Sequence, residues 1–208
     1  MPRPRSLTPA RLATATLAVI DRDGLGALTM RTVAKDLGMA TMSLYRYVSD
    51  RDELETLVVE HVLAGIDVSP PAGDWREQVA TLLARLRDAV RAHPATVPLL
   101  VRHRHAAPSS TRLIEAMLAV LTEAGFRGRQ RVVAQRTVIS FLLGVLQNEY
   151  YAPLSGAGAA AMARLSDVDY PLLSETAAEA ARLDADEEYR RGLEVVLRGL
   201  VAGGGEVL

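Results

Sequence analysis

The stretch from Thr29 to Asp52, TMRTVAKDLGMATMSLYRYVSDRD, constrains the fold of this chain more than any other segment. Thr29 is a favourable N-cap for a helix, and the apolar residues that follow it recur at helical spacing. Gly38 stands where the end of that helix needs a residue with positive φ. We therefore expect a helix that begins after Thr29 and ends in a tight turn at Gly38.

A shorter second helix is expected over about Thr41–Tyr47, and a third from about Arg51, since Asp50 and Glu53 have the spacing of an N-cap and an N3 residue. Two helices joined by a short turn with a glycine form the unit that places a recognition helix in the major groove. The alternative is an ordinary corner between two core helices. The second helix argues against this, because it has few apolar residues and carries two tyrosines, hydroxyls and an arginine.

These residues resemble the DNA-binding domain of the tetracycline-repressor (TetR) family. The resemblance covers about residues 8–60 and rests on three motifs: Thr29-x-Arg31-x-x-Ala34-x-x-Leu37-Gly38-Met39, Met42-Ser43-Leu44-Tyr45-Arg46-Tyr47-Val48 and Asp50-Arg51-Asp52-Glu53-Leu54. Weaker similarities to the ends of tetracycline-repressor-type chains are Phe141-x-x-Gly144, Tyr189-x-x-Gly192-Leu193 and Arg198-Gly199-Leu200. The resemblance implies an all-α fold, with a three-helix helix-turn-helix DNA-binding domain over residues 1–66 and a helical ligand-binding and dimerisation domain over residues 67–208.

The resemblance also implies which residues contact double-stranded operator DNA: Thr29, Arg31, Thr41, Met42, Ser43, Tyr45, Tyr47 and Arg51. Arg31 is the candidate base reader, because its guanidinium can pair with O6 and N7 of guanine. Tyr45, Tyr47 and Arg51 are expected on phosphates, where they fix register without reading sequence. Relatives usually have Ser or Thr at the position of Ala40, so Thr41 is expected to cap the second helix one residue late.

Charge is unevenly distributed along the chain. Residues 1–51 contain eight basic and four acidic side chains, a net charge of +4, and the overall charge of −1 leaves −5 for the remainder. A basic end on a mildly acidic body suits phosphate contact by one end, although a difference of this size also arises by ordinary scatter. Arg3 and Arg5 lie in an N-terminal arm that either reaches DNA or is a plain disordered tail.

Several other classes of protein are disfavoured. The chain has no cysteine, and no GxSxG, HExxH, GxGxxG or P-loop motif, so we expect neither an enzyme nor a disulfide framework. The N-terminus has no apolar signal core, and no stretch of ~18 residues is apolar and uncharged, which predicts a soluble cytoplasmic protein without a membrane span. No cofactor is expected.

The remainder of the chain reads as helices separated by loops. Residues 66–74 contain two prolines and a glycine and are the best domain boundary. Helices are expected over 74–93, 95–104, 111–124, 130–152 and 186–201, with Ser109 or Ser110 capping the third of these. Residues 153–171 are expected to form a loop with at most a weak helix around 157–164.

TetR-type bodies enclose an apolar cavity, which implies a small-molecule effector. The polar candidates to line it are His61, His103, Gln135, Gln147 and Asn148, and each is equally a satisfied structural residue. Aromatic residues are scarce in this chain, so a hydrophobic or amphipathic effector is favoured over a sugar or nucleotide. His103 and His105 do not share a helix face and have no acidic neighbour in sequence, so no metal site is predicted.

A homodimer is expected, built as a four-helix bundle from residues 130–152 and 186–201 of two copies, because the first of these helices is apolar on more than one side. The interface candidates are Ile139, Leu143, Leu146, Tyr150, Tyr189, Leu193, Val196 and Leu200. Gly192 and Gly199 would allow a partner helix to approach closely. The function that follows is a ligand-responsive transcriptional repressor on a palindromic operator; the alternatives are a constitutive DNA-binding regulator and a helical interaction module.

Overall fold

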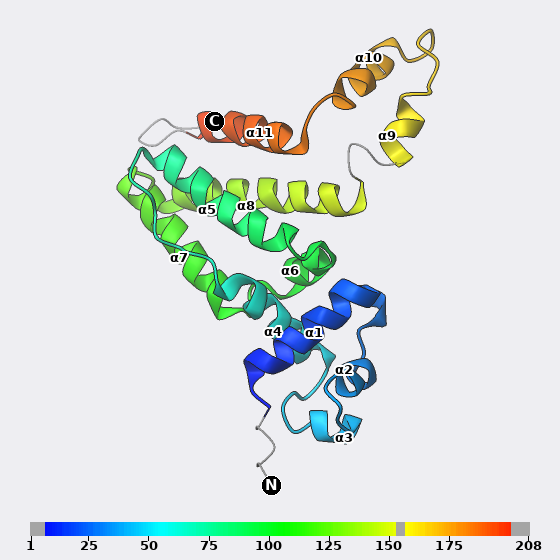
Figure 1. The fold of residues 1–208 in the computed structure, drawn as a ribbon. Helices are drawn as coiled ribbons and strands as arrows, with labels where there is room; N and C mark the ends of the chain where they lie inside the picture. Colours follow the sequence, from blue (N-terminus) through cyan, green and yellow to red (C-terminus); the bar gives the residue numbers. More distant parts are fainter. Residues whose placement is uncertain (1–6, 153–156, 201–208) are drawn as a thin grey trace. The chain divides into compact units, whose positions relative to one another are not determined.

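The computed structural model describes residues 7–152 and 157–200, and in this part of the chain all regular structure is helical (Figure 1). The helices are α1 (Pro9–Asp23), α2 (Met30–Asp36), α3 (Thr41–Leu44), α4 (Arg51–Ala64), α5 (Trp75–Arg91), α6 (Val97–His103), α7 (Pro108–Glu123), α8 (Gly128–Tyr151), α9 (Ala157–Met162), α10 (Pro171–Ala180) and α11 (Ala185–Gly199), with 3₁₀ turns at Leu25–Ala27 and Pro94–Thr96. The all-α prediction is confirmed. None of the described helices is both long and apolar enough to cross a bilayer. Arg3, Arg5 and Val201 lie outside the described residues.

The chain forms two compact units. Unit 1 comprises Met1–Ser69 and Ala84–Ala116, and unit 2 comprises Pro70–Leu83 and Met117–Leu208. In unit 1, α1 packs on α2 and α4, α2 packs on α3, and α4 packs on α6. The core of this unit is formed by fully buried aliphatic side chains, among them Ile20, Leu28, Val33, Leu44, Leu54 and Val58.

The start of α1 follows directly from its sequence. Thr8 is the N-cap and accepts a hydrogen bond from the backbone N–H of Arg11 at 3.2 Å, and Pro9 occupies the first helical position, as predicted. Pro9 suits that position because its missing N–H would have no partner within the helix. One face of the helix, with Leu12 and Val19, is buried.

The helix-turn-helix also begins as predicted but continues differently. Thr29 caps α2 through a reciprocal pair of hydrogen bonds with Thr32, and Gly38 has a φ of 67° in the turn. The second helix is shorter than expected, because after Leu44 the backbone bonds change to turn-type contacts, such as the Tyr47 N–H to the Leu44 carbonyl at 2.9 Å. The expectation that Thr41 caps this helix is wrong: Ala40 is the N-cap and supplies no side-chain acceptor.

Unit 2 is built around α8. The stripe Tyr189, Leu193 and Leu197 of α11 is buried, and α11 packs on α8. A Cβ at Gly192 would lie 3.0 Å from Cζ of Phe141, so this glycine permits the chain's own α8 to approach α11. The ring of Phe141 in turn stacks on Tyr189, with ring centroids 6.0 Å apart. Nothing lies within 4 Å of a Cβ at Gly199.

Some helix boundaries differ from the expectation. The helix α7 begins at Pro108, before either serine that was expected to cap it, and Ser109 and Ser110 are buried within its first turn. The helix α10 occupies Pro171–Ala180, where the sequence pattern predicts none, and Pro171 stands at its first position. The weak helix expected around 157–164 is present as α9, Ala157–Met162.

The cap of α4 gives a testable contribution to stability. Oδ1 of Asp50 accepts a hydrogen bond from the backbone N–H of Glu53 at 2.8 Å. Asp50→Ala removes this acceptor, and we expect the free energy of unfolding in urea to fall by about 1 kcal/mol. Asp50→Asn keeps an acceptor at the same place and should remain close to wild type. An equal loss in both variants would show that charge, rather than capping, is responsible.

Candidate functional site

The residues predicted to contact DNA lie on and around α2 and α3 of unit 1. Arg31, Tyr45 and Tyr47 are exposed, and Thr41 and Ser43 are partly exposed. Met42 is 78% exposed. Leu44 and Val48 are buried beneath this surface and anchor α3 and the turn that follows it. The segment thus presents an amphipathic, uncharged helix face flanked by arginines.

Thr29 has a structural role in addition to its predicted contact. Its hydroxyl accepts a hydrogen bond from the backbone N–H of Thr32 at 3.0 Å, and Thr32 Oγ1 accepts one from the Thr29 backbone N–H at 2.9 Å. The hydroxyl of Thr32 also donates to the carbonyl of Ala27 at 2.8 Å. These bonds fix the first turn of α2, which carries Arg31.

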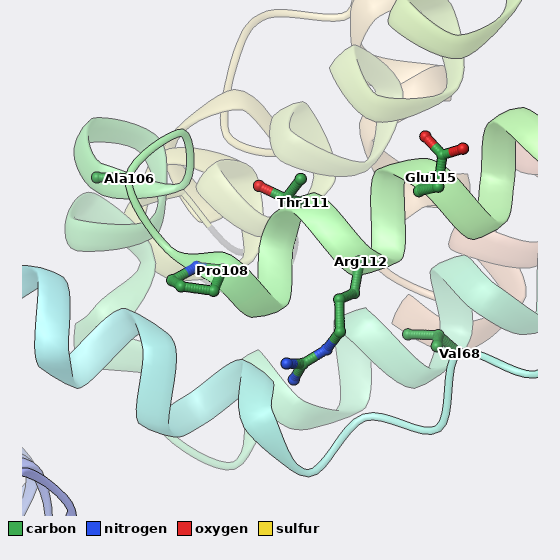
Figure 2. Close-up of a pocket in the computed structure, with 6 residues that line it drawn as sticks. All are labelled: Val68, Ala106, Pro108, Thr111, Arg112 and Glu115. Carbon is green, nitrogen blue, oxygen red and sulfur yellow. The ribbon is translucent and has the colours of Figure 1, made fainter.

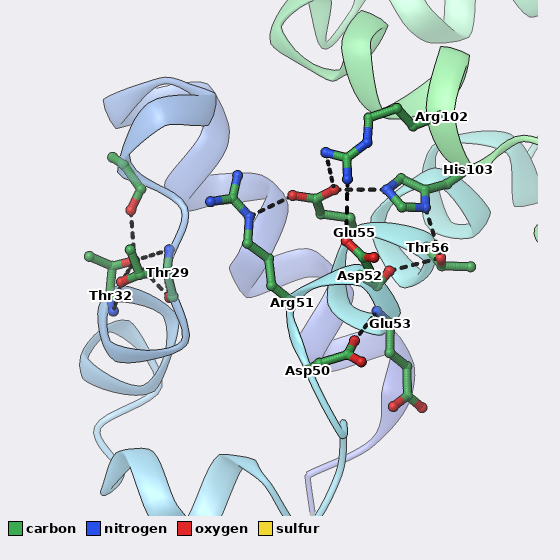
Figure 3. A network of polar contacts seen from close by, with 11 residues as sticks. Thr29, Thr32, Asp50, Arg51, Asp52, Glu53, Glu55, Thr56, Arg102 and His103 are labelled. Atoms are coloured by element: carbon green, nitrogen blue, oxygen red, sulfur yellow. Dashed lines mark hydrogen bonds and ion pairs between the residues drawn. The ribbon is translucent and has the colours of Figure 1, made fainter.

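Arg51, at the first position of α4, belongs to a network of charged groups (Figure 3). Its Nε donates to Oε1 of Glu55 at 2.6 Å. Oε2 of Glu55 accepts from Nε2 of His103 at 2.8 Å and pairs with Arg102 at 3.3 Å, both on α6 or at its end. Glu55 is fully buried, whereas the side chain of Arg51 is 47% exposed. Because Glu55 is the acceptor, Nε2 is the ring nitrogen of His103 that carries a proton.

The same cluster is the candidate metal centre among the described residues. One ligand atom each of Asp52, Glu55 and His103 lie within 4.8 Å of one another. The guanidinium of Arg102, however, contacts both carboxylates, at 3.4 Å for Asp52 and 3.3 Å for Glu55. With Arg51 the two acids face two permanent cations, so the negative charge that would attract a metal is already balanced. The chemistry of these groups therefore fits an ion-pair network better than a cation site.

The residues predicted to bind an effector are divided between the two units. His61 and His103 belong to unit 1, and Gln135, Gln147 and Asn148 belong to unit 2. His61 contacts the hydroxyl of Thr14 at 3.3 Å, and His103 is occupied by Glu55. Gln147 donates to the carbonyl of Leu143 in its own helix at 3.1 Å. Gln135 is partly buried and Asn148 is exposed.

Unit 1 contains an open cleft of about 690 Å³ that sequence reasoning did not identify (Figure 2). It is lined by Val68, Ala106, Pro108, Thr111, Arg112 and Glu115. None of the five predicted effector residues is among them. Thr111, Arg112 and Glu115 lie within about one turn of α7, and that grouping is the only local signal in the sequence. Val68 is brought to the cleft by the loop after α4, which no periodicity predicts.

Hydrogen bonds connect this cleft to α4. Nη2 of Arg112 donates to Oγ of Ser109 at 2.8 Å. Ser109 donates from its hydroxyl and its backbone N–H to the two carboxylate oxygens of Glu60, at 2.6 and 2.7 Å. Glu60 thereby satisfies a free N–H in the first turn of α7, where a carboxylate is favoured by the helix dipole.

The loop that carries Val68 is held by Arg85. Its Nη1 donates to the carbonyls of Asp67 and Ser69, at 2.7 Å each, and its Nη2 pairs with the Asp67 carboxylate at 3.2 Å. The backbone N–H of Ser69, which donates to the Asp67 carboxylate at 2.9 Å, lowers the pKa of Asp67, and the charge of Arg85 adds to this effect. The ionised form of Asp67 thus favours this loop conformation, to which the two carbonyl contacts of Arg85 also contribute.

The fold and the exposed surface of α2 and α3 define a helix-turn-helix transcription regulator. Residues 69–203 match the family described as "Tetracyclin repressor-like, C-terminal domain". The chain belongs to the tetracycline-repressor family, which confirms the family predicted from its sequence. It is a DNA-binding transcription regulator and not an enzyme, as its curated relatives are transcription regulators.

Individual relatives align with this chain along most of their length. An HTH-type transcriptional regulator of Saccharopolyspora erythraea is 29% identical over 206 residues, with 96% of this chain and 86% of that protein aligned. The Tetracycline repressor protein class D of Escherichia coli is also 29% identical, over 89% of this chain and 85% of the repressor. Among solved structures, the Streptomyces coelicolor TetR family protein ActR in complex with actinorhodin aligns at 29% identity with a TM-score of 0.80, covering 96% of this chain and 99% of ActR.

Proposed function

We propose that this protein is a cytoplasmic, ligand-responsive transcriptional repressor. In this proposal a homodimer binds a palindromic operator through residues 1–66, and residues 67–208 form the dimer and bind a small apolar effector that releases the DNA. The observation that carries the proposal is the outward face of α2 and α3, which exposes Arg31, Met42 and two tyrosines while Leu44 and Val48 hold it in place. A structural helix corner gains nothing from exposing a methionine and two tyrosines.

The exposed groups suit different parts of a DNA duplex. Arg31 has the planar fork that recognises guanine, and its backbone is fixed by the Thr29–Thr32 capping box. Tyr45 and Tyr47 follow α3 and are suited to phosphates through their hydroxyls. Met42 is suited to apolar contact with a thymine methyl group. In this arrangement the first turn of α2 and the whole of α3 would contact the bases.

Arg31 provides the test of DNA reading. Arg31→Ala should weaken binding to the preferred duplex by about 1–3 kcal/mol and relax the preference at one base position in each half-site. The measurement is selection from a randomised duplex library with wild-type and variant protein, starting from DNA upstream of the coding sequence. Arg11→Ala, in α1, is the matched control and should leave the preferred sequence unchanged. An unaltered preference in Arg31→Ala would remove this residue from base reading.

The proposed dimer interface uses the sides of α8 and α11 that the chain itself leaves open. Leu146, Tyr189 and Leu193 are buried within the chain, so they support the interface from beneath. The partly exposed candidates are Ile139, Leu143, Tyr150, Val196 and Leu200. A twofold dimer would place two α3 helices about 34–36 Å apart, which requires an inverted-repeat operator.

Two arginines introduced into the proposed dimer interface should separate the subunits. Leu143→Arg combined with Val196→Arg places unpaired charges in the proposed apolar interface, and we expect a monomer at micromolar concentration by sedimentation velocity. Neither side chain is fully buried within the chain, so the fold should persist by circular dichroism. Val168→Arg, at a side chain that is 86% exposed, is the control and should remain dimeric. A double variant that still dimerises would place the interface elsewhere.

An effector is supported by the relative that was solved with actinorhodin and by the cleft beside α7. A ligand lowers DNA affinity only by preferring a conformation that binds DNA badly, so its effect equals its differential affinity for the two states. The alternative is a constitutive regulator, or a helical interaction module without an inducer, in which any cavity is passive.

Coupling between effector and operator is measurable in both directions. We expect an apolar or amphipathic compound, with actinorhodin as the first probe, to weaken operator binding by about 5- to 150-fold, and operator DNA to weaken binding of the compound by the same factor. A thermal-shift screen identifies binders, and fluorescence titration with operator DNA measures the coupling. A compound that stabilises the protein and leaves operator affinity unchanged would favour the constitutive alternative.

A further inference from the structure

Glu55 is a fully buried carboxylate, and hydrophobic burial gives no reason for a charged side chain at this position. It lies in the second turn of α4, the helix whose apolar residues pack on α1 and α6. Its side chain has no exposed surface. Removing a carboxylate from water costs several kcal/mol, which only good partners recover. Apolar residues commonly replace such ion pairs without loss of stability, so folding alone does not require a charge at this position.

The two oxygens of Glu55 have different partners. Oε1 accepts from Nε of Arg51 at 2.6 Å, at the N-terminal end of α4. Oε2 accepts from Nε2 of His103 at 2.8 Å and pairs with Nη1 of Arg102 at 3.3 Å, so it contacts the end of α6 (Figure 3). One carboxylate therefore connects a predicted DNA-contact residue to a helix that lies outside the helix-turn-helix.

We propose that Glu55 is a positioning residue for operator binding: it holds the guanidinium of Arg51 for a DNA phosphate and makes that orientation depend on His103 of α6. This inference rests on the proposed function, specifically on the phosphate contact of Arg51. It adds a residue that touches no DNA but sets the geometry of one that does.

The geometry leaves Arg51 able to do this. Only its Nε is used by Glu55, so the two terminal nitrogens remain for a phosphate, which a guanidinium fork can bind in a bidentate manner. A free arginine side chain loses rotamer entropy when it binds. Glu55 restricts that freedom before DNA arrives, which reduces the entropic cost of contact.

Repulsion between Glu55 and the phosphate is the opposing effect, and it is small here. Glu55 is buried and balanced by Arg51 and Arg102, with Asp52 and His103 as the remaining ionisable members of the network. The two acids and the two arginines together have no net charge. The network as a whole therefore does not repel DNA. The ordering of Arg51 then decides whether Glu55 raises or lowers operator affinity, and we expect it to raise the affinity.

The α6 side of the network is itself well ordered. His103 is 12% exposed, and its Nδ1 lies 3.5 Å from the hydroxyl of Thr56, which also donates to the carbonyl of Asp52 at 2.9 Å. The shorter bond from Nε2 to Glu55, rather than Thr56, therefore sets the orientation of the ring. Loss of the His103 contact would leave Oε2 of Glu55 with the longer contact to Arg102 alone and would let Glu55, and with it Arg51, adopt other rotamers.

A double-mutant cycle with Arg51 tests the proposal. Glu55→Gln keeps the shape of the side chain and removes its charge, and His103→Leu removes the contact from α6. With the duplex selected from the library, we expect each variant to bind about tenfold more weakly, the equivalent of 1.4 kcal/mol. We also expect the slope of log affinity against log salt to fall toward that of Arg51→Ala, by about one contact. In the Arg51→Ala background both substitutions should have no further effect.

Controls separate positioning from folding and from the proposed function. Glu123→Gln removes an exposed charge at the end of α7, outside the network, and it should leave affinity unchanged. Circular dichroism establishes that each variant is folded, and His103→Leu provides the result if Glu55→Gln does not fold.

Losses of equal size with and without Arg51 would overturn the proposal, because Glu55 would then act through the fold. No loss in either variant would also overturn it. If Arg51→Ala binds like wild type, the phosphate contact itself fails, and if wild type selects no duplex, the proposed function fails.

Discussion

Packing of α4 in unit 1 is the constraint on which the DNA-binding part of this protein depends. Leu54, Val58 and Leu63 are buried on a helix that contacts both α1 and α6. The same helix carries two carboxylates in the interior or at its margin, Glu55 toward α6 and Glu60 toward the first turn of α7. Apolar burial provides most of the stabilisation, while the directional polar contacts fix how the helix is rotated and where it lies along its partners.

The recognition surface has the opposite character. Four residues of α3 cannot form a stable helix alone, so the element depends on Leu44 and Val48 beneath it and on the turn at Gly38. Its outward residues are exposed on the surface of unit 1, where we propose that they contact DNA. The geometry of the surface is therefore set by buried residues, and its chemistry by exposed ones. Substitutions at the two kinds of position should have separable effects.

Local sequence patterns predicted the elements whose signals are short-range. Thr8, Thr29 and Asp50 were identifiable as caps, and Gly38 as a turn residue, because each depends on neighbours within about four residues. The length of α3 was overestimated, since where a helix ends depends on the packing of Leu44 and Val48 as well as on propensity. The helix α10 has no apolar stripe and no buried residue, so periodicity offered no signal for it.

The sequence by itself determined the helical class, the position of the helix-turn-helix and the group of residues proposed to contact DNA, because these follow from spacing along one chain segment. Only the tertiary structure decided the partners of Glu55, Glu60 and Arg112. Glu55 and His103 are 48 positions apart, and their contact exists because α4 and α6 pack together. Apart from the i,i+4 pair of Arg51 and Glu55, nothing local in the sequence records that network. Contacts between distant segments depend on how helices pack, and one sequence alone does not specify the register of that packing.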